Sequence, residues 1–126
     1  MSPFELWRFL PFGYLLTIAI ETPILFFGLS PHHSKGRRIA AGIWLTACTY
    51  PIVILVLPLL LVDQSRALFL LVAEVFAPVA ECLLFWLAFG KRATSRDFGV
   101  IAIANLASFV TGEILWAVFI RGQKIL

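Results

Sequence analysis

Charged residues are scarce in this sequence. Asp, Glu, Lys and Arg make up 13% of its 126 residues, whereas hydrophobic residues make up 61%. A soluble domain usually has about a quarter of its residues charged and about half apolar. The mean hydropathy of +0.98 points the same way. This composition excludes an ordinary water-soluble domain and predicts a chain whose main solvent is lipid.

Cysteine, histidine and the motifs of common enzymes are also rare or missing. The two cysteines, Cys48 and Cys82, have no CxxC or Cys/His spacing, so no zinc site or redox pair is predicted. No glycine-rich phosphate loop, GxSxG, HExxH or CxxCH is present. His32 and His33 lie in a basic segment, where we expect solvated side chains near lipid headgroups rather than a metal site. An enzyme is therefore the least favoured class.

Long apolar blocks take the place of alternating polar and apolar residues. Four of them cover residues 9–29, 39–62, 67–89 and 100–120. About 20 helical residues cross a hydrocarbon core, and a helix satisfies its own backbone there. The sequence predicts an all-α integral membrane protein. We expect four transmembrane helices in an antiparallel bundle, forming a single domain over residues 1–126.

The short connections between the blocks set the expected orientation. The connections 30–38 and 90–98 must share one side of the membrane. They hold six of the ten Lys and Arg residues: Lys35, Arg37, Arg38, Lys91, Arg92 and Arg96. Cytoplasmic loops usually carry such an excess, so we expect these loops in the cytoplasm and both termini outside, in the plasma (inner) membrane. Anionic headgroups of the lipid bilayer account for the net charge of +3, and no nucleic-acid partner is expected.

Four glutamates lie within the predicted spans, namely Glu21, Glu74, Glu81 and Glu113. An ionised carboxylate at the bilayer centre costs at least about 2.5 to 3.5 kcal/mol, so such residues usually face a bundle interior and mark a functional site. The alternative is structural. Protonated carboxyl groups can hold neighbouring helices together by hydrogen bonds that contribute about 1 kcal/mol each.

The depths of these glutamates predict two layers. Glu21 and Glu81 each lie eight residues before the end of their span on the basic-loop side, so we expect them at one height. Glu74 and Glu113 each lie seven residues from the opposite end and form a second expected pair. Glu74 and Glu81 also share a face of their helix. Such an arrangement is typical of a path for protons or cations.

Other polar residues extend the candidate site. Thr46, Thr49 and Tyr50 follow i, i+3, i+4 spacing in the second span, and Asn105 and Ser108 lie near the expected height of Glu21 and Glu81. Oxygen ligands suit hard cations such as Mg²⁺, Ca²⁺ or Mn²⁺. We expect Glu21 and Glu81 to share a proton or to ligate a divalent cation. The full set of candidate ligands is Glu21, Glu81, Glu74, Glu113, Asn105, Tyr50, Thr46 and Ser108.

Small residues and prolines within the spans indicate how the helices pack. Ala104, Ser108 and Gly112 form a row of small residues that allows close approach of another helix. Four prolines each free a backbone carbonyl and kink a helix: Pro23, Pro51, Pro58 and Pro78.

A faint internal similarity suggests two repeated helical hairpins. The segment ETPILFFG from Glu21 resembles ECLLFWLAFG from Glu81, and WLTACTYPIVIL from Trp44 resembles NLASFVTGEILW from Asn105. Two such hairpins would point the same way and be related by an axis along the membrane normal, as in parallel-repeat transporters. Glu21 and Glu81 would then be equivalent positions facing each other.

Three functions fit these features. We favour a small carrier or channel that binds protons or a hard metal cation through its intramembrane glutamates. The second is an accessory subunit of a larger membrane complex, and the third an intramembrane enzyme acting on a lipid-like substrate. A 14.1 kDa chain has little room for an enclosed path. We therefore expect a homo-oligomer or a larger membrane complex under each of them.

Overall fold

Long helices make up almost the whole structure. The computed structural model describes the backbone of residues 3–125 and the side-chain exposure of residues 11–115, 117 and 118. The elements are α1 (Pro3–Gly28), α2 (Lys35–Pro51), a π-helix (Ile52–Val56), α3 (Leu57–Leu60), α4 (Arg66–Phe89), a 3-10 turn (Gly90–Arg92) and α5 (Ser95–Ile125). No strand occurs between residues 3 and 125, so the predicted all-α class is confirmed.

Four helical stretches are long and apolar enough to cross a membrane, as the sequence predicted. They cover Pro11–Gly28, Lys35–Leu60, Arg66–Arg92 and Ser95–Leu115. The second and fourth begin earlier than predicted, because a hydroxyl caps each helix before its apolar part starts. Ser34 Oγ accepts a hydrogen bond from Arg37 N (3.2 Å), and Thr94 Oγ1 accepts one from Asp97 N (3.3 Å). Hydropathy does not detect these first polar turns.

The second stretch is interrupted rather than continuous. It passes from α2 through the π-helix Ile52–Val56 to the short α3, and prolines flank the break at positions 51 and 58. Pro58 has no N–H, so it cannot bond the carbonyl of Ile54, and the chain adopts the wider turn instead. Leu57 N bonds Ile52 O in this segment. The kink expected at these prolines is therefore a π-helical segment.

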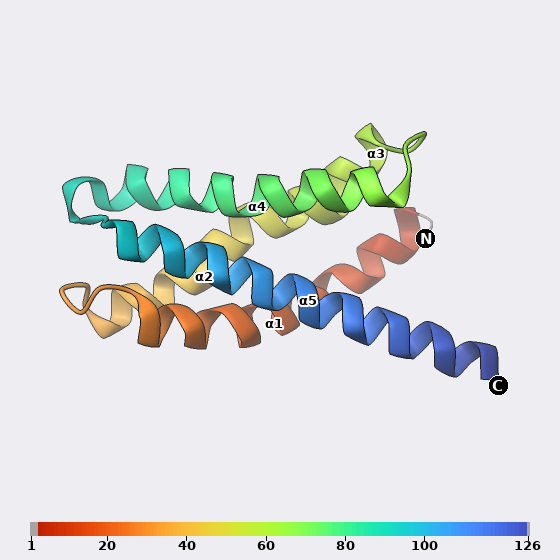
Figure 1. Cartoon of the computed structure of the whole chain (residues 1–126), viewed down its shortest axis with the longest axis horizontal. Coiled ribbons are helices and arrows are strands. Elements are labelled where there is room, and N and C mark those ends of the chain that lie inside the picture. The colour runs from red at the N-terminus through yellow and green to blue at the C-terminus, as the bar shows by residue number, and fades with distance from the viewer. Residues whose placement is uncertain (1–2, 126) are drawn as a thin grey trace.

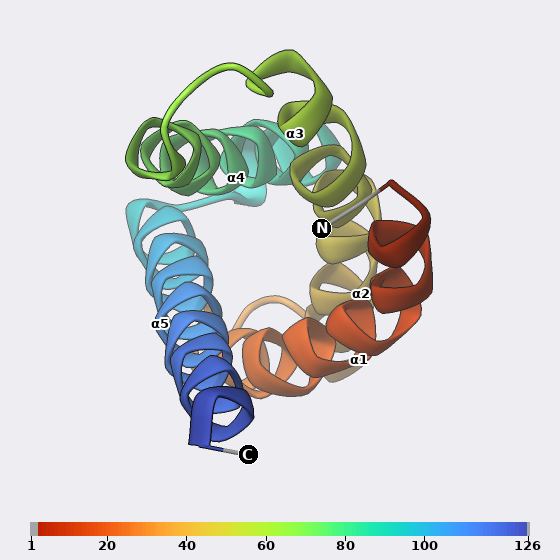
Figure 2. The same cartoon turned by 90° about the vertical axis from the view of Figure 1, so that its right-hand side faces the viewer.

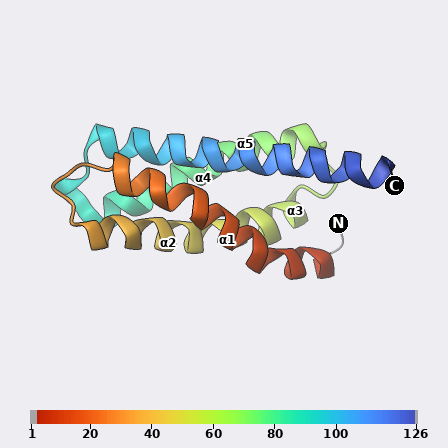
Figure 3. The ribbon, with the colours of Figure 1, turned by 90° about the horizontal axis from the view of Figure 1, so that it is seen from below.

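The helices pack most tightly in the half of the molecule that contains the two basic loops, 30–38 and 90–98. We call it the loop half. Figure 1 shows the connections α1 to α2 and α4 to α5 together at one end, and Figure 2 shows α1, α2, α4 and α5 arranged around a common centre. In Figure 3, α1 and α5 diverge toward the two termini. The core lies in the loop half: Leu25, Leu29, Ala41, Leu45, Phe85, Ile101 and Ala104. In the other half, the buried residues among those described are Gly13, Leu57 and Ala73.

The exposure pattern of α1 recurs in α4 sixty residues later. Residues 13–25 and 73–85 have the same order of buried, half-buried and exposed side chains at every position. Glu21 and Glu81 hold the same place in this pattern, each four residues before a core residue, Leu25 or Phe85. The capping residues Ser34 and Thr94 are also sixty residues apart. The first helix of each hairpin therefore buries the same face over these residues.

The outer faces of the helices are apolar. Large side chains such as Phe27, Leu60, Val79 and Ile103 are more than half exposed. A protein in water rarely exposes so large an apolar surface, whereas lipid tails solvate it without penalty. The outside of the bundle thus suits a hydrocarbon environment.

Helices α1 and α2 approach each other closely at Gly42, so substitution there should destabilise the fold. A Cβ atom at position 42 of α2 would lie 2.5 Å from Oγ1 and 3.0 Å from Cα of Thr22 on α1. Overpacking of this kind costs about 1–3 kcal/mol. We expect Gly42→Leu to lower the melting temperature of the detergent-solubilised protein, measured by circular dichroism.

Gly112→Leu is the matched control. The sequence placed Gly112 in a row that packs against another helix, but in the structure it is exposed, and an added Cβ meets no atom within 4 Å. We therefore expect Gly112→Leu to melt like the wild type. Equal melting of the Gly42 and Gly112 variants would contradict the close α1–α2 crossing.

Candidate functional site

Two carboxyl groups are buried at the centre of the bundle. Glu21 of α1 is 3% exposed and Glu81 of α4 is 2% exposed. The two groups interact electrostatically. Leu25 and Phe85, one turn further along each helix, belong to the apolar core. The packing that buries the core thus also buries both carboxyl groups.

Helix α5 supplies polar partners for both glutamates. Ser108 Oγ donates a hydrogen bond to Glu21 Oε2 at 2.5 Å. Asn105 lies near Glu81, and its Nδ2 donates a hydrogen bond to the Ile101 carbonyl at 2.9 Å. Of the two residues expected near this layer, Ser108 is hydrogen-bonded directly to Glu21. Three helices contribute to one polar cluster.

One oxygen of this cluster lacks a partner. Glu81 Oε2 is buried and has no hydrogen bond within the described part of the chain. The ion pairs among the described residues are His33 with Asp97 and Arg66 with Glu113, so neither Glu21 nor Glu81 is paired with a cationic side chain there. Burying two unpaired carboxylates is costly. The cluster is therefore suited to hold a proton or another cation.

Glu74 lies near the pair, whereas Glu113 is paired with a cation. Glu74 is half-buried on α4 and interacts electrostatically with Glu21. Arg66 Nη2 donates to Glu113 Oε1 and Oε2 at 3.1 and 3.0 Å, in a half-exposed ion pair between the start of α4 and α5. In the second layer expected from the sequence, Glu113 is therefore paired with Arg66.

The polar residues of α2 have mainly local partners. Thr46 and Thr49 are buried, but their hydroxyls donate to Gly42 O (2.9 Å) and Leu45 O (3.0 Å) of their own helix. Tyr50 is half-buried, and its ring centroid lies 6.2 Å from that of Tyr14. Among the described contacts, none of these three residues has a hydrogen bond to a glutamate.

A second polar cluster joins the two basic loops. Asp97, fully buried, accepts hydrogen bonds from Ser30 N (Oδ1, 2.7 Å), His33 Nε2 (Oδ2, 2.9 Å) and Thr94 N (Oδ2, 2.9 Å). The hydroxyls of Ser30 and Thr94 are 2.8 Å apart. We call Ser30, His33, Thr94 and Asp97 the loop clamp. It holds the two hairpins together beyond the apolar core.

The expectation of two solvated histidines is not met for His33. His33 is 2% exposed, and its ring centroid lies 5.5 Å from that of Phe85 and 5.1 Å from that of Phe89. His32 is exposed, and its Nε2 donates to the Arg92 carbonyl at 2.7 Å. The sequence did hold a signal, because Asp97 is the one acidic residue in two basic loops that were expected to share one side of the membrane.

The donor atoms of His32, His33 and Asp97 lie within 4.8 Å of one another, a grouping that could hold a metal ion. However, both Asp97 oxygens and the Nε2 atom of each histidine already take part in hydrogen bonds. These bonds connect the loops without any ion. The buried Nδ1 atom of His33 has no hydrogen-bond partner among the described residues. The hydrogen bonds give this group a structural role whether or not an ion binds there.

Two arginines complete the connection between the loops by bonding the end of α1. Arg38 Nη1 donates to Phe26 O at 2.6 Å, and Arg96 Nε donates to Gly28 O at 2.8 Å. The last carbonyls of a helix have no partner within it, so these cations satisfy them. Positive charge in the basic loops thus has a structural role besides any attraction to lipid.

Comparisons of the chain with protein-family models, curated proteins and solved structures find no match. The chemistry of the buried side chains is therefore the basis for assigning a function. The central pair Glu21 and Glu81, with Ser108 and Asn105 near it, combines two buried carboxyl groups with an oxygen atom, Glu81 Oε2, that has no hydrogen-bond partner among the described residues.

Proposed function

We propose that this protein is a small membrane carrier that binds a proton or a hard metal cation between Glu21 and Glu81. The supporting observation is the buried pair of carboxyl groups, of which Glu81 Oε2 has no hydrogen-bond partner among the described residues. A proton shared by the pair, or a cation bound to it, removes the penalty of burying two like charges. Binding and release of that cation is the activity we assign to the site.

The chemistry of the surrounding groups supports a hard cation. The carboxyl groups of Glu21 and Glu81, the hydroxyl of Ser108 and the amide of Asn105 offer oxygen atoms. Oxygen ligands favour Mg²⁺, Ca²⁺ or Mn²⁺ over softer metals. A proton needs only one acceptor oxygen and makes the smallest demand on space. Both occupants use the same pair of glutamates.

The recurring exposure pattern supports a two-fold arrangement of the site. Glu21 and Glu81 occupy the same place in the matching segments 13–25 and 73–85. Two hairpins related by an axis along the membrane normal would place these glutamates opposite each other in an antiparallel transmembrane bundle. A binding site between two such repeats can open in turn to each side of the membrane when one repeat rocks against the other, as alternating access requires.

The uneven packing supports access from the side of the termini. The loop half is closed by the core around Leu25, Phe85 and Ile101 and by the loop clamp. The other half has few buried residues in the described part and carries Glu74 next to the pair. With the basic loops in the cytoplasm, this conformation would accept its cation from outside the cell.

Purified full-length protein in liposomes tests this proposal. We expect flux of protons or of a divalent cation down an imposed gradient, followed with a pH-sensitive or metal-sensitive dye. Elemental analysis of the detergent-solubilised protein distinguishes a metal from a proton. Flux equal to that of empty liposomes, with no bound metal, would contradict the proposal. Recovery of the chain only together with other polypeptides would favour the accessory subunit.

A further inference from the structure

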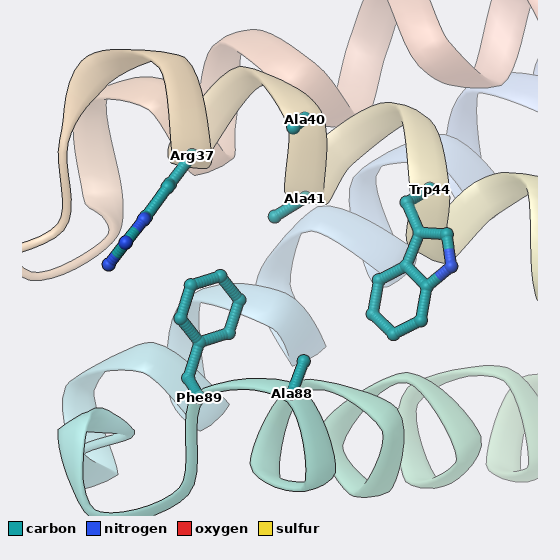
Figure 4. A pocket seen from close by; sticks show the side chains of 6 residues that line it. All are labelled: Arg37, Ala40, Ala41, Trp44, Ala88 and Phe89. Atoms are coloured by element: carbon teal, nitrogen blue, oxygen red, sulfur yellow. The ribbon is translucent and has the colours of Figure 1, made fainter.

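A groove separate from the glutamate site lies between α2 and α4 at the basic end of the bundle. It consists of two adjoining cavities of about 420 and 230 Å³ that share Arg37, Ala88 and Phe89 as lining residues. In Figure 4, Arg37 and Trp44 extend from α2, and Ala88 and Phe89 extend from α4 toward the space between the helices. The remaining lining residues are Arg92 in the larger cavity and Ala40, Ala41 and Trp44 in the smaller one.

The two ends of this groove differ in chemistry. Arg37 and Arg92 line the larger cavity, and neither guanidinium group has a hydrogen bond or ion pair in the described part of the structure. Arg38 and Arg96, in contrast, are used to bond the end of α1. The smaller cavity is lined by alanines and aromatic rings beyond Arg37. The groove thus has a cationic end and an apolar end.

The surrounding field also favours an anion at the cationic end. The loops 30–38 and 90–98 contain six Lys or Arg residues and one acidic residue, Asp97, which is bound within the loop clamp. Arg37 lies in the first turn of α2, where the helix dipole adds partial positive charge. Trp44 lies further along α2 and lines the apolar end of the groove. Tryptophan side chains are enriched near lipid headgroups because the indole ring is amphipathic.

We propose that this groove binds one anionic phospholipid. Its phosphate lies between Arg37 and Arg92, and the first part of an acyl chain follows Ala41, Trp44 and Ala88 between α2 and α4. Basic pockets between helices are suited to anionic headgroups, and guanidinium groups bind phosphate oxygens through charge-assisted hydrogen bonds. The bound lipid fills a gap at the end where both hairpins meet.

Native mass spectrometry of the delipidated full-length protein tests this inference. We expect one phosphatidylglycerol molecule to be retained where phosphatidylcholine is not. Combining Arg37→Gln with Arg92→Gln should weaken phosphatidylglycerol binding about tenfold or more. The matched control is Lys35→Gln with Lys91→Gln, which removes the same charge from the same loops outside the groove. It should change the affinity less than about twofold. An equal loss of phosphatidylglycerol affinity in both double variants would show that the basic loops attract anionic lipid in general. That result would overturn the specific site.

Two further measurements examine the apolar end and the source of the phosphate. Ala88 is exposed, so Ala88→Phe should fold normally, fill the groove and weaken phosphatidylglycerol binding without any change of charge. Unchanged lipid binding in this variant would overturn the placement of the acyl chain. Inorganic phosphate at millimolar concentration should not displace the lipid. Displacement would assign the cationic end to free phosphate and overturn the lipid proposal.

Discussion

Glu81→Gln is expected to reduce proton or cation flux in liposomes to the background of empty vesicles while the protein still folds. The amide keeps the size of the carboxyl group and its hydrogen-bonding capacity toward Asn105. It cannot release a proton, and it removes one of the two negative charges that attract a cation. The measurement is dye-reported flux at equal protein content, with circular dichroism as the check on folding.

The other glutamates provide graded controls for this result. Glu21→Gln should have the same effect as Glu81→Gln, because the two groups form one site. Glu74→Gln should reduce flux less, since Glu74 is only half-buried beside the pair. Glu113→Gln should leave flux nearly unchanged, because Glu113 is bound by Arg66.

A purely structural role for the glutamates predicts a different pattern. If they only hold helices together, Gln still bonds its neighbours, and only replacement by Leu would disturb the protein. Full flux in the Glu21→Gln, Glu81→Gln double variant would remove the transport proposal. The accessory-subunit interpretation would then be favoured.

The helices could be predicted from the apolar runs, and the common depth expected for the central glutamates was inferred from regular helix geometry. A run of apolar residues long enough for a membrane has to be helical, and the helical rise per residue is fixed. Equal distances from the span ends therefore placed Glu21 and Glu81 at one height. Their burial in a common cluster with Ser108 depends on helix rotation, which the periodicity of the polar residues only indicated.

The missed contacts depend on where helices begin and on residues far apart in the chain. Glu113 was assigned to the interior because it lies within an apolar block, but Arg66 at the start of α4 forms an ion pair with it. The loop clamp joins Ser30 and His33 to Asp97 across more than sixty residues, and no local pattern encodes that distance. Similarly, hydropathy treats residues 39–62 as one helix, although Pro58 cannot supply the N–H that a continuous helix requires.

Asp97→Ala is expected to be the most destabilising single substitution outside the apolar core. It leaves Ser30 N, Thr94 N and His33 Nε2 without their acceptor in a buried place. Each unsatisfied buried donor costs about 1–3 kcal/mol. The melting temperature in detergent should fall markedly. Asp63→Ala, which changes an exposed aspartate in the opposite turn, should melt like the wild type.

The same substitution should open the loop end of the bundle, and Cys82 reports this opening. Cys82 is half-buried on α4, with its Sγ 3.7 Å from Phe98 O of α5. With Cys48→Ser as background, Cys82 is the only thiol. Its reaction with a thiol reagent below the melting temperature should be faster in Asp97→Ala than in Asp63→Ala, because the clamp no longer holds α5 against α4. Equal reaction rates and equal melting in the two variants would show that the core alone closes this end.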